Sequence, residues 1–436
     1  MTTDSLQFTR VLQVTENVDV LVLGGGMAGI SAAIAAARYG AKTMLVERHA
    51  TLGGAGATCG VGAFCGETTG QGAVFDEVVE RLTKLDAIAP YHPYEELEYR
   101  KFNHQVLPFV LQEMVSKWGV ELLLHTWFAG VDYADGVAKH VVILGKSGLE
   151  AIRPKVTIDC TGEADVIRSA GLPTFKGRDS DHAQFPMALM FFMRDVGTKV
   201  QPILPDGCEE LTDDTLPMTS PWPEPLDWAQ ASGQNATDEP SKVGIKMKVI
   251  GYDATTTRGL SAAEVFARRR MFSLIDYWQR AKFPNHAFDH VAAQIGIREG
   301  CRVVGEYVLT EKDVKEGRRF DDGVAQGIMY LDAMSPGTDK KVYIPDSSGS
   351  MLFQPPPYHI PFRSLRPKGT KNLLTAGRCL SADHLAMSSA RVMTTCSMMG
   401  QAAGIAAAMC VEGRHDTAAL DVQKLRQALL ERTARL

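Results

Sequence analysis

Three glycines near the start of the chain have the spacing of a phosphate-binding turn. Gly24, Gly26 and Gly29 form the pattern GxGxxG directly after an apolar run, with Met27 and Ala28 inside the motif. In such a turn the first glycine permits the tight bend, the second lets the backbone approach a pyrophosphate, and the third lets helix and strand pack closely. Amides at the start of the following helix then face the phosphates. The pattern predicts a dinucleotide-binding site.

A carboxylate and a second glycine-rich stretch narrow the choice of dinucleotide. Glu47 ends the next apolar run, 18 residues past Gly29, close to the ~20 expected for the acid that binds a ribose hydroxyl. Because a carboxylate there repels a 2′-phosphate, we expect NADP to be excluded. NAD and FAD share the motif. The glycine-dense stretch that follows Arg48 and begins at Gly53 and Gly54 favours FAD, since backbone without side chains can lie along a longer cofactor.

Short apolar runs predict the strands that must position these residues. Runs that end at glycine or polar residues are typical of buried parallel strands. An alanine-rich run at 26–39 has a helical period and closes at Gly40, a common C-terminal cap. Together with its neighbours it predicts one βαβ unit. The predicted strands come from distant parts of the chain, at 18–23, 43–46, 120–124, 156–160 and 372–376.

The middle of the chain has a different character. Residues 202–225 are rich in proline and acidic residues, which favours a long surface excursion over a regular element. Residues 242–252 alternate in the manner of a strand. Residues 261–282 predict a helix, with Ser261 as N-cap and Glu264 completing a capping box.

These runs predict an α/β fold with two domains. We expect a Rossmann-like, FAD-binding domain at 1–172 and 361–436, interrupted by an α+β substrate domain at 173–360. Residues 417–436 form an amphipathic run. Packing on its own domain and a contact in a homo-oligomer are both open interpretations of that run.

Composition excludes several classes of function. A formal charge of −5 and a pI near 6.1 provide no basic surface for nucleic acid. The eight cysteines contain no CxxC pair, so we expect no metal or iron–sulfur centre. The first residues lack the pattern of a signal peptide. The longest apolar stretch, 395–411, is rich in glycine and alanine and contains Gln401, which predicts a packed helix and no membrane span. The expected location is the cytoplasm.

With these residues in place, the chain resembles FAD-dependent oxidoreductases of the glutathione-reductase-like superfamily, in the branch related to fumarate reductase and succinate dehydrogenase flavoproteins. The resemblance implies bound FAD and an oxidoreductase activity on a small-molecule substrate. The span 195–240 matches no family block and is a candidate for the part that selects the substrate. The blocks that carry the resemblance are DVLVLGGGMAG at 19–29, ER and LGG within 47–54, IDCTGEAD at 158–165, IRE at 297–299, GEYVLT at 305–310, RFDD at 319–322, NLLTAGR at 372–378, and RVMTTC and GQAAG within 391–404.

The resemblance also implies further contacts to the cofactor. Gly162 lies where the family's chain turns beside FAD, and Arg378 ends a neighbouring strand. The helix that contains Gly400 points its amino end at the flavin N1–C2=O edge in this superfamily, where negative charge develops on reduction. This places Arg391 and Thr395 beside the flavin. A small-residue helix packed only for stability is the alternative.

Two histidines are candidates for proton transfer. Hydride transfer to a flavin needs a substrate held over the ring and an acid or base for the accompanying proton. His384 lies just before the helix that meets the flavin, where it serves either as acid or base or as a structural loop histidine. His359 and Arg363 follow a triple proline and are expected to reach the same cavity.

Cations and thiols complete the candidate set. Arg391 and Arg298 are the expected partners of a substrate carboxylate, with an ion pair to Glu299 as the rival role of Arg298. Cys59 and Cys65 lie in the glycine-rich loop near the flavin. Their spacing is wider than that of a redox dithiol, which favours packing under the ring.

The electron acceptor is left open by the sequence. The chain contains no histidine between residues 50 and 91, where some relatives attach the flavin, so we expect non-covalent, extractable FAD. No second GxGxxG follows a strand, so electrons pass to oxygen, a quinone, a carrier protein or a nicotinamide docked in another way. The leading hypothesis is a dehydrogenase or oxidase. A reductase of an activated C=C bond and an electron-transfer subunit are the alternatives.

Overall fold

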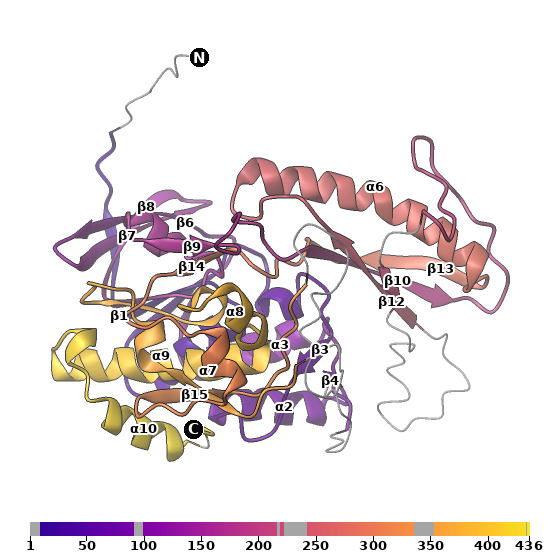
Figure 1. Ribbon diagram of the computed structural model, residues 1–436. Coiled ribbons are helices and arrows are strands. Elements are labelled where there is room, and N and C mark those ends of the chain that lie inside the picture. The colour runs from indigo at the N-terminus through magenta and orange to yellow at the C-terminus, as the bar shows by residue number, and fades with distance from the viewer. Residues whose placement is uncertain (1–8, 91–98, 216–218, 222–241, 335–352, 433) are drawn as a thin grey trace.

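A seven-stranded sheet forms the centre of the first of two regions (Figure 1). The computed structural model describes residues 9–90, 99–215, 219–221, 242–334, 353–432 and 434–436. All five predicted strands lie in this sheet, which confirms the α/β fold. The strands are β1 (Val14–Leu23), β2 (Thr43–Val46), β5 (Glu121–Leu123), β6 (Trp127–Ala134), β7 (Val137–Gly145), β8 (Gly148–Asp159) and β17 (Leu373–Thr375).

The order of the strands brings distant segments to one edge. The sheet runs β5-β2-β1-β8-β7-β6, and β17 also pairs with β8. Strands β5, β2, β1, β8 and β17 are parallel, while β6, β7 and β8 form antiparallel hairpins. Residues 20–23 of β1 are buried on both faces, as expected for a parallel strand covered on both sides. The carboxyl ends of β1, β2, β8 and β17 therefore meet.

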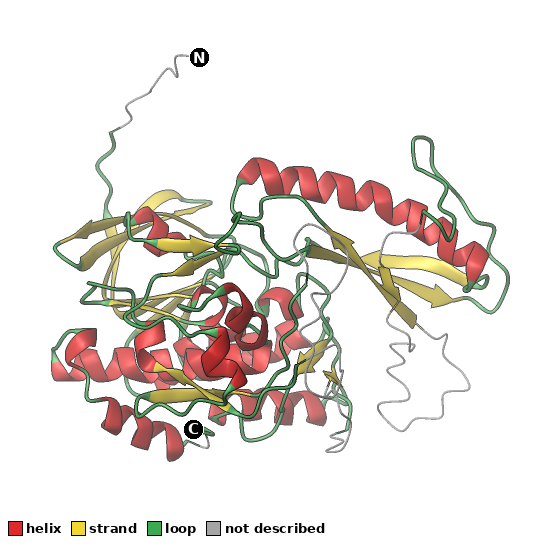
Figure 2. Ribbon diagram, in the orientation of Figure 1, coloured by secondary structure: helices red, strands yellow, loops and turns green. Residues whose placement is uncertain are grey.

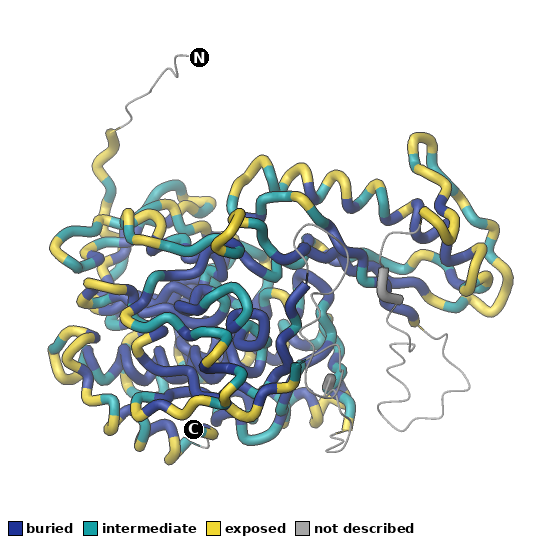
Figure 3. Tube along the Cα trace, in the orientation of Figure 1, coloured by how far each residue is buried: buried dark blue, intermediate teal, exposed yellow. Residues whose placement is uncertain are grey.

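Two helices of small residues cover one face of the sheet. α1 (Met27–Arg38) and α9 (Met393–Gly413) cross so closely that a Cβ on Gly400 or Gly404 would overlap a backbone oxygen of α1. Ser31 and Ser397 hydrogen-bond across the crossing at 2.6 Å. Among the described residues, α9 is the one helix long and apolar enough to cross a membrane, but 89% of its most apolar window is buried inside the protein. Figure 3 shows α9 as a core helix.

The remaining helices of this region surround the same core. They are α2 (Ala73–Lys84), α3 (Leu107–Lys117), α4 (Asp165–Ser169), α7 (Glu311–Lys315), α8 (His384–Ala390) and α10 (Val422–Leu430). Three small sheets complete it: β3 (Ala63–Cys65) with β4 (Tyr99–Lys101), β9 (Thr174–Lys176) with β14 (Cys301–Val303), and β15 (Gly323–Gly327) with β16 (Tyr358–Pro361).

A four-stranded antiparallel sheet and one long helix form the second region (Figure 2). Its order is β11 (Thr219–Pro221), β12 (Lys242–Val249), β10 (Met187–Asp195) and β13 (His286–Val291), and α6 (Thr257–Ala281) covers one face. Leu189, Phe191 and Met193 pack in a core with α6. Met190 and Phe192 alternate with them and face away from α6, as the two-residue period of a strand requires.

The start of α6 differs from the sequence prediction. The helix begins at Thr257, and the Thr256 side chain accepts a hydrogen bond from the Gly259 amide. Ser261 therefore lies inside the helix, and the predicted capping box with Glu264 is wrong. Thr256 provides the same type of N-cap before Ser261 is reached. A helix that begins at Thr257 therefore satisfies one of its terminal amides with the Thr256 side chain.

The second region is narrower than the predicted insertion at 173–360. Its own core spans residues 187–297, whereas Leu309, Val314, Phe320 and Val324 pack into the core of the first region. Residues 202–215 form turns and irregular backbone, in line with the predicted excursion at 202–225. Positions 216–218 and 222–225 of that prediction lie outside the described residues.

Candidate active site

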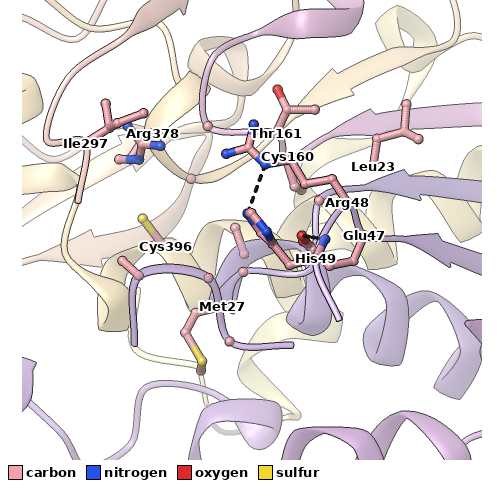
Figure 4. A pocket seen from close by; sticks show the side chains of 18 of the residues that line it. Leu23, Met27, Glu47, Arg48, His49, Cys160, Thr161, Ile297, Arg378 and Cys396 are labelled. Carbon is pink, nitrogen blue, oxygen red and sulfur yellow. Dashed lines mark hydrogen bonds between the residues drawn. The ribbon is translucent and has the colours of Figure 1, made fainter. Parts of the chain in front are cut away.

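One pocket follows the carboxyl ends of the parallel strands and continues to the second region (Figure 4). It begins at the turn between β1 and α1, passes the ends of β2 and β8, and reaches residues 294–297 beyond β13. In open α/β sheets, ligands bind outside the carboxyl ends of the strands. The pocket therefore lies where the fold positions a dinucleotide.

The predicted glycines bring two loops into close contact at one part of the pocket. Gly24 has φ +104°, and a Cβ there would overlap the carbonyl of Cys160. A Cβ on Gly29 would likewise overlap the Gly24 carbonyl, and one on Gly54 would lie 2.9 Å from the Gly26 Cα. The two glycine-rich loops thus meet backbone to backbone. Gly26 is the N-cap of α1 and no side chain caps the helix, so its first amides face the pocket with Met27 and Ala28. This cradle fits the pyrophosphate of FAD.

Glu47 is held in place for a hydroxyl partner. The side chain is 6% exposed. Its Oε2 accepts the Gly25 amide at 2.5 Å and its Oε1 accepts the His49 amide at 2.8 Å. The carboxylate lines the pocket as an oriented acceptor, which is the arrangement expected for ribose recognition.

An aromatic wall beside Glu47 was not anticipated from the sequence. Trp127 and Phe128 at the start of β6 line the same end of the pocket. The Arg48 guanidinium lies 5.5 Å from the Trp127 ring centroid and its Nε donates to His49 Nε2 at 3.1 Å. Trp127 is 52% exposed, and this exposure is a property of the fold that sequence reasoning could not have used. A flat apolar wall suits a purine ring.

Arg378 and Gly162 lie together in the middle of the pocket. Gly162 has φ +82°, and a Cβ there would overlap the Arg378 guanidinium. Arg378 Nη1 pairs with Glu163 Oε1 at 3.1 Å. Burial raises the pKa of Glu163 to about 7, although Arg378 opposes the shift.

One arginine lines the far end of the pocket, and a second arginine and a carboxylate lie close to it without lining the pocket. Arg391 lines the pocket with Met393 and Cys396, and its Nη2 donates to Asp332 Oδ2 at 2.8 Å. Arg298 lies near enough to Arg391 that burial, and then the Arg391 charge, lower its pKa to about 10. The far end is therefore a partly buried, cationic site.

The predicted rival role of Arg298 is wrong. Arg298 Nη1 donates to the Pro186 carbonyl at 2.6 Å, and the buried partner of Glu299 is Arg302. The Arg298 guanidinium instead lies close enough to Arg391 and Asp332 to feel both charges.

Thr395 and Gly400 lie behind the pocket. Thr395 is buried in the first turn of α9 without lining the pocket, while Gly400 provides the close contact between α9 and Ala28. The contact of Gly400 with α1 fixes α9, whose first residue, Met393, lines the pocket.

Two residues predicted to act on the substrate, His359 and Arg363, lie elsewhere. His359 is in β16, where its Nδ1 accepts the Phe320 amide at 3.0 Å. Arg363 pairs with Asp322 at 2.9 Å in a surface hollow beside α10. Neither lines the pocket, because β16 pairs with β15 on the far side of α9; the prediction that they reach the same cavity is wrong.

His384 is one layer behind the pocket. Its Nδ1 hydrogen-bonds Glu299 Oε1 at 2.9 Å and its ring stacks on Phe185 at 3.9 Å. Burial, and then the charges of Arg302 and Arg178, lower the pKa of His384 to about 4. The imidazole of His384 is therefore neutral and donates a hydrogen bond to Glu299. Arg302 already balances the negative charge of Glu299. The geometry fits the structural role left open above.

The two loop cysteines are isolated thiols. Burial raises the pKa of Cys59 and that of Cys65, the latter to about 12. Cys59 lines the pocket and contacts Gln294, whereas the backbone oxygen of Cys65 accepts from Thr394. Both are free thiols in the protonated form, which suits packing rather than redox chemistry.

Comparison with known proteins identifies a family and several similar proteins. A model of the family described as FAD dependent oxidoreductase matches residues 19–429. Among curated proteins, digeranylgeranylglycerophospholipid reductase of Thermoplasma volcanium is 27% identical over 176 residues, which are 36% of this chain and 42% of that enzyme. The match therefore spans less than half the length of that relative.

Solved structures superpose over most of the chain at low identity. A geranylgeranyl bacteriochlorophyll reductase-like protein from Thermoplasma acidophilum is 15% identical, with 96% of this chain and 84% of that one covered and a TM-score of 0.47. OxyS anhydrotetracycline hydroxylase from Streptomyces rimosus is 12% identical, with 95% and 65% covered and a TM-score of 0.48.

Proposed function

The chain belongs to the family of FAD-dependent oxidoreductases, and from this premise we propose that it transfers a hydride between FAD and a small organic anion held by Arg298 and Arg391. The enzyme acts on small molecules. FAD, when bound, supplies the acceptor or donor of the hydride.

An excess of positive charge at the far end of the pocket carries this proposal. Of the two guanidiniums, Arg391 has Asp332 as its carboxylate partner, while Arg298 has only a backbone carbonyl as a hydrogen-bond partner within the described residues. The charge of Asp332 also acts on Arg298, so the two guanidiniums share one carboxylate and one positive charge is left unbalanced, which is costly for a partly buried group. A substrate carboxylate between the two arginines would supply that charge and orient the reacting carbon.

The other lining residues fix the position of the cofactor. The α1 amides and the glycine cradle fit the pyrophosphate, and Glu47 accepts from the ribose. In the part of the chain that the structure describes, the second glycine-rich loop offers no histidine toward the far end, which supports non-covalent FAD. Gln294, Ile295 and Ile297 close the far end from the second region and exclude water there.

Sulfite tests the anion site without knowledge of the substrate. Sulfite is a small anion that adds to flavin N5 and bleaches the visible band of the flavin. We expect Arg391→Gln and Arg298→Gln each to weaken sulfite binding by roughly 10- to 100-fold, since a hydrogen bond to a charged group contributes about 1.5–3 kcal/mol.

Arg270→Gln is the matched control. Arg270 lies on α6 and pairs with Glu209 at the surface, so sulfite affinity is expected to match that of the unaltered protein. Equal sulfite affinity in the unaltered protein and all three variants would contradict the proposal that Arg298 and Arg391 form an anion site. Benzoate, which binds without reacting, should compete with sulfite, and benzyl alcohol should not.

A further inference from the structure

A buried acid lies directly behind the arginine at the middle of the pocket. Glu163 is 5% exposed, and its carboxylate lies against Gly300, where a Cβ would overlap Oε2. The absence of a side chain at residue 300 thus makes room for this carboxylate. Glu163 does not line the pocket, whereas its partner Arg378 does. The acid acts on a ligand only through Arg378.

The charge of Arg378 reaches the far end of the pocket. It lowers the pKa of the Cys59 and Cys396 thiols against the larger effect of burial. Both thiols line the pocket, and Cys396 lies beside Met393 and Arg391. Figure 4 shows Arg378 beside Ile297 among the residues that line the pocket. Glu163 is the one carboxylate within ion-pair distance of Arg378 among the described residues.

We propose that Glu163 is a positioning residue that holds Arg378 against the cofactor and sets, by gaining or losing a proton, how much positive charge Arg378 presents to the flavin. Reduction adds negative charge to the flavin, so a stronger positive neighbour favours the reduced form. The inference rests on bound FAD and is independent of the anionic substrate.

The surroundings of Glu163 place its proton exchange near neutral pH. Burial raises the pKa of this carboxyl to about 7; Arg378 and Arg48 oppose the shift and Asp165 adds to it. The Cys301 thiol also faces the carboxylate. Above pH 7 the ionised acid offsets Arg378. Below pH 7 the acid is neutral and Arg378 acts with its full charge.

The midpoint potential of FAD-loaded protein tests this without any substrate. The potential is measured by dye equilibration for the unaltered protein and for Glu163→Gln between pH 5.5 and 8.5. We expect no difference at pH 5.5 and a difference that grows through pH 7. At pH 8.5, Glu163→Gln should favour reduction about tenfold, or roughly 30 mV for two electrons. Subtracting the potential of the unaltered protein from that of Glu163→Gln at each pH removes the contribution of proton exchange by the flavin itself.

A double-variant cycle assigns the effect to Arg378. Arg378→Gln should lower the potential, and adding Glu163→Gln to it should change nothing. Glu77→Gln is the matched control, because Glu77 also pairs with an arginine, Arg38, but on α2 away from the pocket. Its potential should follow that of the unaltered protein at every pH.

Two results would overturn the inference. One is the same potential for Glu163→Gln and the unaltered protein across the whole pH range. The other is an undiminished shift when Arg378 is already glutamine. If Glu163→Gln does not fold, Glu163→Asp is the second variant, because it keeps an ionisable group but moves it away from Arg378. The difference in midpoint potential between Glu163→Asp and the unaltered protein should then rise less through the same pH range. A flat curve contradicts the inference. None of these results bears on sulfite binding by Arg298 and Arg391.

Discussion

The two regions bury their helices in opposite ways. In the first region α1 and α9 touch through glycine and alanine, with Gly400 and Gly404 against backbone oxygens. In the second region α6 covers its sheet through large side chains such as Phe191 and Met271. Backbone contact leaves no room for change, while large side chains can be exchanged at a cost in packing. The first region therefore tolerates little change around the cofactor cradle, whereas the second region can exchange side chains in its core.

Adding a methyl group to the cofactor turn should have the largest effect. Gly29→Ala places a Cβ onto the Gly24 carbonyl, so the turn must open and the cradle is lost. We expect colourless, poorly folded protein. The unaltered protein should be yellow, and acid precipitation should move that colour into the supernatant because the FAD is not covalently bound.

Gly130→Ala is the control for this change. Gly130 lies in β6 with open space around its Cα, so flavin content and melting temperature should stay within error. Normal flavin content in Gly29→Ala would contradict the description of the turn as a backbone-to-backbone contact.

A cavity in the second region should cost stability but spare the cofactor. Phe191→Ala removes a buried ring between the sheet and α6 and should lower the free energy of unfolding by about 3–5 kcal/mol. Because Phe191 faces away from the pocket, the folded protein should retain stoichiometric FAD at low temperature. The measurements are urea unfolding and the ratio of flavin to protein absorbance. Phe288→Ala, at a 39% exposed site, should change little, and FAD loss in Phe191→Ala alone would show that the regions are coupled.

A smaller, pH-dependent effect is expected where the two regions meet. His384 of α8 stacks on Phe185, just before β10, and burial lowers the pKa of His384 to about 4. As the pH falls below 6.5, His384 is protonated in the unfolded chain but stays neutral in the folded chain. The free energy of unfolding therefore decreases between pH 6.5 and about 4. The slope from this group approaches ~1.4 kcal/mol per pH unit.

His384→Asn should flatten that slope in urea unfolding at pH 7, 6 and 5. His140→Asn, at a more exposed histidine paired with Asp132, should leave it unchanged. An unaltered slope in His384→Asn would mean that the ring is already charged in the folded protein.

Sequence reasoning predicted the site residues that lie close together along the chain. It missed the residues that folding brings to the site from distant segments. Gly24, Gly26 and Gly29 act within six residues, so their spacing carries the geometry of the turn. Trp127 reaches the pocket, and Asp332 reaches the pocket residue Arg391, from separate segments of the chain, and no local pattern marks either residue.

The wrong predictions concern residues whose role depends on the direction in which the side chain points. Arg298 and Glu299 are neighbours in sequence, yet the buried partner of Glu299 is Arg302. His359 was expected near the flavin because of its position after the prolines, but its strand pairs with β15. Side-chain direction depends on the path of the backbone, which apolar patterns do not specify.

The position of β17 and α9 has a consequence for the newly made protein. β17 completes the central sheet beside β8, and α9 seals α1, so the cradle formed by residues 24–54 stays open until residues 373–413 have left the ribosome. The nascent chain must therefore extend past residue 413 before FAD has a finished site. Cofactor capture is thus a late event, and an interrupted translation product carries the glycine signature without the means to keep the flavin.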